Sequence, residues 1–208
     1  MNDATKPEKK PSRIQLRNRK RILDAALEVF SQHGYRGATL DQIADASGLS
    51  KPNILYYFDG KEAIHVTLLN TLMENWLDPL AKMSPDGDPL EEILAYLHRK
   101  LQMSREFPRE SRLFANEILQ GAPRMKPHLE TGLKRLFDEK TALIQRWMDR
   151  GKLAPSDPRH LLLSSWATTQ HYADFEEQVS ILTDRETDPV GGAEQFLDNM
   201  FRKLLTPQ

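Results

Sequence analysis

The feature that most restricts the fold is a pair of short helices predicted on either side of Gly48. Thr39 offers a capping hydroxyl, and Gln42 three residues later completes a T-x-x-Q capping box. Both signals precede a run with helical spacing of apolar residues, so we expect a helix over residues 40–47. Gly48 then ends this helix and permits a tight turn.

A second short helix is expected directly after that turn. Ser50 can cap it, and Pro52 stands in its first turn, where a missing backbone N–H costs nothing. The helix should run over residues 51–58. Two short helices joined by a glycine-containing turn form a helix-turn-helix, and the sequence therefore predicts one over residues 39–58.

The rest of the chain also has helical periodicity, and no segment alternates convincingly between apolar and polar residues. Loops are expected at residues 84–89 and 183–192, and Pro79 should kink or end the helix that contains it. We predict an all-α protein of about nine helices without an internal repeat. The further helices are expected over residues 13–34, 61–83, 90–105, 109–120, 126–150, 157–182 and 193–205.

Charge is distributed unevenly along the 208 residues. Residues 1–21 hold eight basic and two acidic side chains, whereas the remainder holds 21 basic and 28 acidic ones. A basic arm on an acidic body is typical of a nucleic-acid binder, although a solvated tail has the same composition. We expect residues 1–12 to form a disordered basic arm.

The composition excludes several classes of protein. The chain has no cysteine, which rules out disulfides and thiolate metal sites and fits a cytoplasmic location. No apolar run reaches the roughly 20 residues that a membrane span requires, and no secretory signal follows the first methionine. We expect no cofactor and no membrane partner.

If the helix over residues 51–58 enters a DNA major groove, its N-terminal residues meet the bases first. The Asn53 amide can pair with adenine, and Lys51 can pair with guanine or hold a phosphate. Ser50 and Pro52 complete this leading edge. The predicted function of this segment is therefore direct reading of double-stranded DNA.

Three further side chains stand where they could grip DNA phosphates: Tyr56, Tyr57 and Lys61. The alternative is an ordinary helical hairpin in which a tyrosine belongs to the hydrophobic core. Phe58 follows both tyrosines and is expected to be buried in either case.

The segment Ala38–Phe58, followed by Gly60-Lys-Glu-Ala-Ile64, closely resembles the TetR family of bacterial transcriptional repressors. The resemblance implies DNA contacts by Thr39 and by the next position. Leu40 stands there in place of the usual threonine and lacks the hydroxyl for the second phosphate contact. The resemblance also implies a homodimer that binds a palindromic operator. The implied domains are a DNA-binding domain over residues 13–60 and a helical ligand-binding and dimerisation domain over residues 61–208.

Four C-terminal segments resemble the pyrimidine-utilisation branch of that family. This resemblance implies uracil or thymine as an effector that releases the operator, and target genes of pyrimidine or nitrogen metabolism. The segments are residues 111–123, 138–140, 151–155 and 166–175.

A candidate effector pocket follows from the spacing on the helix expected at residues 157–182. Trp166 and Gln170 are four residues apart and share a helix face. An indole supplies a stacking surface and a primary amide both donates and accepts, as a planar imide requires. Trp76, Phe114 and Tyr172 are further candidate walls. The alternative is that Trp166 is plain core and Gln170 lies at the surface or in a dimer interface.

Other functions are weighed against this regulator. His171 and Asp174 could form an acid–base or metal pair in a helical enzyme, but no third ligand or catalytic motif accompanies them. A constitutive architectural DNA binder has no use for so many additional apolar helices. A regulator that answers to an unrelated apolar or aromatic effector also remains open. The helices at residues 157–182 and 193–205 are expected to form the dimer interface as a four-helix bundle.

Overall fold

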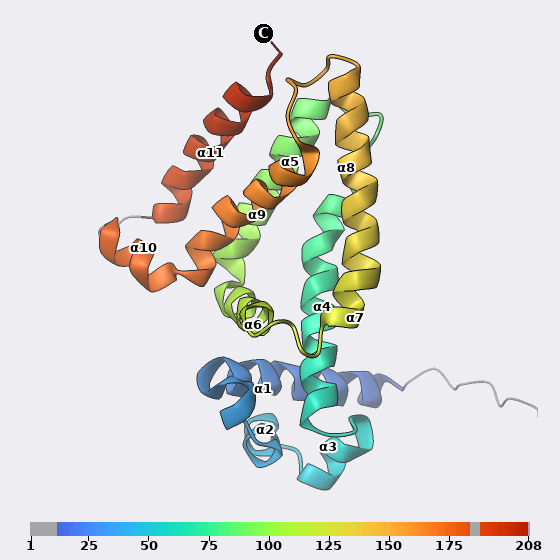
Figure 1. The fold of residues 1–208 in the computed structure, drawn as a ribbon. Coiled ribbons are helices and arrows are strands. Elements are labelled where there is room, and N and C mark those ends of the chain that lie inside the picture. Colours follow the sequence, from blue (N-terminus) through green and yellow to red (C-terminus); the bar gives the residue numbers. More distant parts are fainter. Residues whose placement is uncertain (1–11, 184–187, 208) are drawn as a thin grey trace, which may run out of the picture. The chain divides into compact units, whose positions relative to one another are not determined.

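The computed structural model describes residues 12–183 and 188–207, and every regular element within these ranges is helical, as predicted (Figure 1). The backbone divides into two compact units, Met1–Leu68 and Leu69–Gln208, and the boundary falls inside α4. The elements in chain order are α1 (Arg13–Gly37), α2 (Leu40–Ser47), α3 (Lys51–Tyr57), α4 (Lys61–Ala81), α5 (Pro89–Glu106), α6 (Pro108–Leu119), α7 (Lys126–His128), the π-helix η1 (Leu129–Leu133), α8 (Lys134–Asp149), α9 (Pro158–Asp174), α10 (Glu176–Leu182) and α11 (Pro189–Leu205).

The helix-turn-helix of the first unit forms as its capping residues predict. The Thr39 side chain accepts from the Gln42 N–H, and the Gln42 side chain accepts in turn from the Thr39 N–H, so both partners of the capping box are present. Gly48 ends α2 with φ of 62°, a left-handed conformation that glycine adopts without steric cost. Ser50 then caps α3 by accepting from the Asn53 N–H.

Apolar side chains from α1, α2, α3 and α4 share one small core in this unit. Its centre holds the fully buried residues Ile22, Phe30, Ile43, Ile54 and Ile64. Phe58 is buried, as expected from the sequence, and the guanidinium of Arg19 lies 4.3 Å from the centre of its ring. The core sets the position of α3, because Ile54 is the buried residue of that helix.

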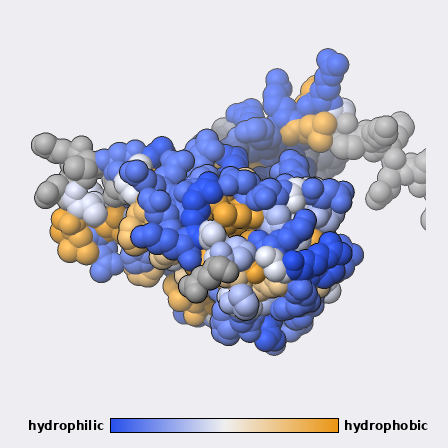
Figure 2. Space-filling view, turned by 90° about the horizontal axis from the view of Figure 1, so that it is seen from above, coloured by the Kyte–Doolittle hydropathy of each residue, from blue (hydrophilic) through white to orange (hydrophobic). Residues whose placement is uncertain are grey.

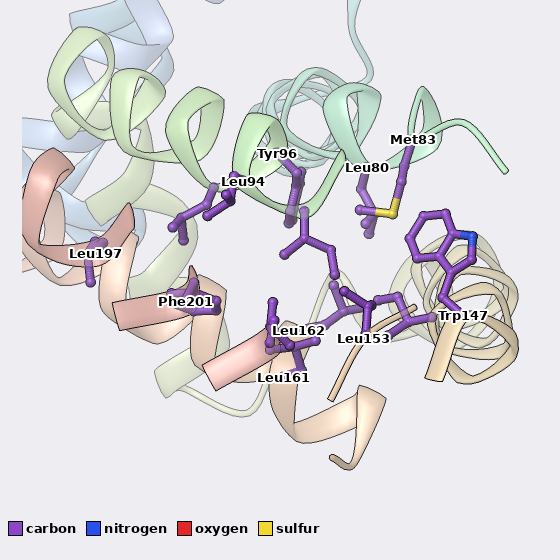
Figure 3. Packing of buried hydrophobic residues seen from close by; sticks show 14 of the residues in the cluster. Leu80, Met83, Leu94, Tyr96, Trp147, Leu153, Leu161, Leu162, Leu197 and Phe201 are labelled. Atoms are coloured by element: carbon purple, nitrogen blue, oxygen red, sulfur yellow. The ribbon is translucent and has the colours of Figure 1, made fainter. Parts of the chain in front are cut away.

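The second unit is built around one large apolar cluster to which α4, α5, α8, α9 and α11 contribute (Figure 3). Helix α5 packs extensively against both α9 and α11, and α9 also packs against α6 and α8. The Trp147 side chain of α8 lies beside Met83 and Leu153, and Phe201 of α11 lies near Leu162 of α9 (Figure 3). This packing fixes α5 and α9 against each other.

Two predicted long helices are interrupted. The helix expected over residues 157–182 is divided at Phe175 into α9 and α10. The Arg112 side chain donates to the Ala173 carbonyl at 3.1 Å, so a partner outside the helix takes up a carbonyl that could have continued it. The helix expected over residues 126–150 contains the π-helical stretch η1, in which the Lys134 N–H donates to the Leu129 carbonyl. The break at Phe175 has no glycine or proline signal, whereas η1 contains Gly132 and closely follows Pro127.

Two predicted boundaries also differ. The loop expected over residues 183–192 is shorter, because α11 begins at Pro189 and includes two glycines in its first turns. Asp188 stabilises this start, since its Oδ1 accepts from the backbone N–H groups of Val190 and Gly191 at 3.1 Å. Pro79 lies within α4, which ends two residues later at Ala81. The predicted arm, except for Ser12, lies outside the described residues.

Candidate functional site

The N-terminus of α3 presents an exposed polar edge. Ser50, Lys51, Pro52 and Asn53 are all exposed, and the Asn53 side-chain amide makes no hydrogen bond among the described residues. The Lys51 ammonium forms a salt bridge with Asp41 of α2 at 3.0 Å, and both side chains are largely exposed. Such surface pairs contribute little stability, so Lys51 can exchange this partner for another anion at small cost.

The two tyrosines at the end of α3 have different environments. Tyr56 is 70% exposed, which excludes it from the core, and its hydroxyl lies 3.4 Å from the Gln15 amide nitrogen. Tyr57 is half-buried and its hydroxyl accepts from the Asn18 amide at 3.0 Å. The rings meet edge to face with centroids 5.0 Å apart. The sequence did not predict that α1 would position both hydroxyls.

Lys61 and Thr39 are both engaged within the first unit. The Lys61 ammonium donates to the carbonyls of Tyr35 and Ala38 at 2.7 and 2.8 Å and lies 4.6 Å from the centre of the Tyr35 ring. The Thr39 hydroxyl serves the capping box, and Leu40 beside it is half-buried. Lys61 thus has a structural task that its sequence position did not indicate.

Helix α1 adds basic side chains that the sequence analysis counted in the basic N-terminal region without giving them individual roles. Arg13 and Arg17 lie one turn apart and are exposed, and neither forms a salt bridge or hydrogen bond within the described part of the chain. Lys20, by contrast, pairs with Asp24 at 2.7 Å. Unpaired arginines on an exposed helix are suited to contact phosphate.

The aromatic candidates of the second unit form two pairs. The ring of Trp76 on α4 meets Phe114 of α6 edge to face, with centroids 5.5 Å apart. The indole N–H of Trp166 donates to the Tyr96 hydroxyl at 2.6 Å, and its ring lies 5.7 Å from that of Phe137. Burial of Tyr96 raises the pKa of its phenol well above the usual value, so the phenol stays neutral and can accept this hydrogen bond.

Gln170 and Tyr172 complete the predicted pocket set. Gln170 is half-buried one turn beyond Trp166, and no hydrogen bond engages its amide among the described residues. Tyr172 is half-buried and packs against the large apolar cluster. Two surface cavities, of about 490 and 440 Å³, are lined by other residues and include none of the five predicted ones.

A buried lysine and a half-buried aspartate lie in this unit, and the sequence did not single them out together. Lys100 of α5 is 5% exposed, and burial lowers the pKa of its ammonium to about 8, although the nearby Asp174 carboxylate raises it in part. Burial likewise raises the pKa of Asp174, opposed by a hydrogen bond from Ser111 and by the charges of Lys100 and Arg112. The burial of Lys100 could not be predicted from the sequence, because a lysine in an amphipathic helix is usually exposed.

The acid–base pair considered for an enzyme does not form. The Asp174 carboxylate accepts from the Ser111 hydroxyl at 2.5 Å, whereas the exposed His171 ring stacks on Phe175 with centroids 4.9 Å apart. Among the described residues, no group of three or more histidine or acidic side chains could hold a metal ion.

Family models match both units of the chain. Residues 22–66 match the model described as bacterial regulatory proteins of the tetR family. Residues 69–208 match the model described as YcdC-like protein, C-terminal region. The chain belongs to the TetR family. This membership confirms the all-α fold with an N-terminal helix-turn-helix and assigns the protein as a DNA-binding transcriptional regulator.

Individual TetR-family relatives agree with this assignment. The chain is 48% identical over 180 residues to the HTH-type transcriptional regulator RutR of Escherichia coli K12, which covers 86% of this chain and 85% of RutR. It is 26% identical over 171 residues to the IcaR negative regulator of the biofilm operon icaADBC in Staphylococcus epidermidis, covering 79% and 88% of the two chains. These relatives are transcriptional regulators and not enzymes.

Solved structures share the TetR fold at low identity. A TetR-like transcriptional regulator from Rhodococcus sp. RHA1 superposes with a TM-score of 0.68 at 19% identity, covering 94% of this chain and 98% of that one. AibR in complex with isovaleryl coenzyme A and operator DNA gives a TM-score of 0.68 at 17% identity, covering 92% and 100%. In the described part of this chain, no helix is both long and apolar enough to span a membrane.

Proposed function

We propose that this regulator is a cytoplasmic homodimeric repressor that binds a palindromic operator and is released from it by uracil or thymine, so that genes of pyrimidine or nitrogen metabolism are expressed. The observation that carries the effector assignment is the pairing on α9, where Gln170 follows Trp166 by one turn and keeps a free amide among the described residues. An amide beside aromatic rings matches a planar imide, whose edge both donates and accepts. The resemblance of residues 166–175 to the pyrimidine-utilisation branch supports the same ligand.

Operator binding is assigned to α3 and its flanks. Asn53 reads a base, Lys51 reads a base or holds a phosphate, and Tyr56 and Arg17 hold phosphates. Thr39, Leu40, Tyr57 and Lys61 complete the predicted contact surface. The exposure of Asn53 and its unengaged amide support this role. A single short helix contacts few base pairs, and a dimer doubles the contact over half-sites about 34–36 Å apart.

The homodimer is supported by exposed apolar side chains on the last helices of the chain. Leu163, Phe175, Phe196 and Leu204 of the α9–α11 region are 46–64% exposed. Ile181 and Leu182 of α10 are also exposed, and Figure 2 shows apolar side chains gathered at the left end, where Figure 1 has α10. A second copy of the chain that covers this face removes it from water.

Sedimentation of a charged variant tests the dimer. Phe196→Glu places a carboxylate in the proposed interface and should give a monomer that binds the operator weakly, because each copy then holds one half-site. Leu119→Glu is the matched control, since Leu119 is 82% exposed on α6 and should leave the dimer intact. A monomeric wild-type protein contradicts the proposal.

The operator response tests the function as a whole. Purified protein selects its operator from a random-sequence DNA library, and fluorescence anisotropy then follows release of that DNA as uracil is added. Release by uracil or thymine supports the proposal. Release only by an unrelated apolar molecule favours the alternative effector class, and binding that no small molecule changes favours a constitutive DNA binder.

A further inference from the structure

We propose that Lys100 and Asp174 form the polar half of the effector site and hold the carbonyl and N–H edge of a planar cyclic imide that lies against Trp76. This inference rests on the proposed function and specifies the chemistry by which the ligand is recognised. Neither residue belongs to the set that the sequence predicted for the pocket.

The side chain of Lys100 is buried, and its ammonium keeps donors for a ligand. The residue is 5% exposed, and no hydrogen bond to its ammonium is present among the described residues. Its nearest described partners are the Trp76 ring, whose centre lies 5.4 Å from Nζ, and the charge of Asp174. An ammonium has three donors, and a ligand that covers Lys100 must supply acceptors in place of water. A ligand carbonyl oxygen can satisfy one of these donors.

Asp174 has acceptor capacity to spare. Its Oδ1 accepts from the Ser111 hydroxyl at 2.5 Å, and no hydrogen bond to Oδ2 is present in the described ranges. The charged groups that act on this carboxylate are Lys100 of α5, Arg112 of α6 and His171 of α9. A carboxylate among cations is an acceptor for an N–H group and has no donor of its own when ionised.

The side chains of α5 and α9 place these groups in one row. Tyr96 and Lys100 are one turn apart on α5, and Trp166, Gln170 and Asp174 succeed one another by single turns on α9. Tyr96 bonds to Trp166, and Lys100 interacts with Asp174. The two helices pack directly against each other, and along α9 Gln170 lies between Trp166, which bonds to Tyr96, and Asp174.

The row defines a class of ligand. It offers a cation that donates, a carboxylate that accepts, an amide that does both, and an aromatic face. A flat ring with alternating carbonyl and N–H groups satisfies all of them. An apolar effector takes water from the Lys100 ammonium and the Asp174 carboxylate without replacing its hydrogen bonds, which costs binding free energy. The pair therefore favours a cyclic imide over an apolar molecule.

Calorimetric titration of the full-length protein with uracil tests the pair. Lys100→Met removes the donor and keeps an unbranched chain, and it should weaken uracil binding at least about tenfold, because a charge-assisted hydrogen bond is lost. Lys152→Met is the matched control, because Lys152 is exposed and should leave uracil affinity unchanged. On wild-type protein, 1,3-dimethyluracil should bind at least about tenfold more weakly than uracil, since it lacks both N–H groups.

Thermal unfolding without ligand separates recognition from a role in the fold. If Lys100 serves the ligand, Lys100→Met should keep or raise the melting temperature, because it removes a poorly paired buried charge. A lower melting temperature shows that the charge serves the fold and overturns the inference.

The outcomes distinguish failure of this inference from failure of the proposed function on which it rests. Uracil binding that is equal in wild type and Lys100→Met, or equal affinity for uracil and 1,3-dimethyluracil, overturns the inference and leaves the uracil-responsive regulator standing. Absence of binding heat with wild-type protein overturns both.

Discussion

The ammonium of Lys100 lies 5.4 Å from the centre of the Trp76 ring, in a place where burial lowers the pKa of the lysine to about 8. The ordinary pKa is 10.5, so between these values the unfolded chain binds the proton more strongly than the folded one. The free energy of unfolding should therefore rise with pH through this window. The shift sets an upper limit of about 3 kcal/mol on the effect.

Urea unfolding at pH 7.5 and 10 measures this dependence. Other groups also titrate in that range, so the comparison is between wild type and Lys100→Met. The free energy of unfolding of the wild type, taken relative to that of Lys100→Met, should rise from pH 7.5 to pH 10. A difference that is constant with pH shows that the lysine keeps its ordinary pKa.

Asn53→Ala should relax base preference at one position of each half-site and cost about 1–3 kcal/mol per lost contact. The exposed amide of Asn53 has no other task among the described residues, so the fold should be unaffected. Arg17→Ala is the contrasting variant and should weaken all DNA sequences to a similar extent. Binding to operator and to scrambled DNA, measured side by side, decides the roles. Equal losses on both DNAs for Asn53→Ala would remove its assignment as a base reader.

Lysines of the basic arm should steepen the salt dependence of operator binding. Deleting residues 1–11 removes Lys6, Lys9 and Lys10. The slope of log affinity against log salt should then become shallower by up to the contribution of about three phosphate contacts. Base preference should stay the same. Anisotropy at several salt concentrations gives the slope, and an unchanged slope identifies the arm as a passive tail.

Tyr96→Phe should lower the free energy of unfolding by about 1–3 kcal/mol, because the indole N–H of Trp166 loses the acceptor it contacts at 2.6 Å. Chemical denaturation measures the loss. The variant should also weaken uracil binding, since Trp166 is then free to turn. Tyr172→Phe is the control for the unfolding measurement alone, because no hydrogen bond of the Tyr172 hydroxyl is present in the described residues.

The local signals of the first unit were sufficient to predict its helices. Thr39, Gly48 and Ser50 act on backbone groups within four residues of themselves, so their effect can be read from the sequence. The tasks of Lys61 and Tyr57 could not be read in this way. Their partners, Ala38 and Asn18, are 23 and 39 residues away along the chain.

The second unit was predicted less well for the same reason. The division between α9 and α10 involves a bond from Arg112 to the Ala173 carbonyl, 61 residues away, and Phe175 itself carries no helix-breaking signal. The aromatic candidates could be chosen by type and spacing. The burial of Lys100 and its nearness to the charge of Asp174 could not be predicted, because both depend on which helices pack together.

The central claim is that a pyrimidine changes the affinity for DNA through α4, which belongs to both units. Its most direct test is the operator dissociation constant of wild type and Gln170→Leu, measured by anisotropy with and without saturating uracil. Wild-type affinity should fall about 5–150-fold with uracil, the usual range of such coupling. Gln170→Leu keeps a similar side-chain volume without hydrogen-bonding groups. This variant should bind the operator normally, and its dissociation constant should not change when uracil is added. A wild-type dissociation constant that uracil leaves unchanged would contradict the account.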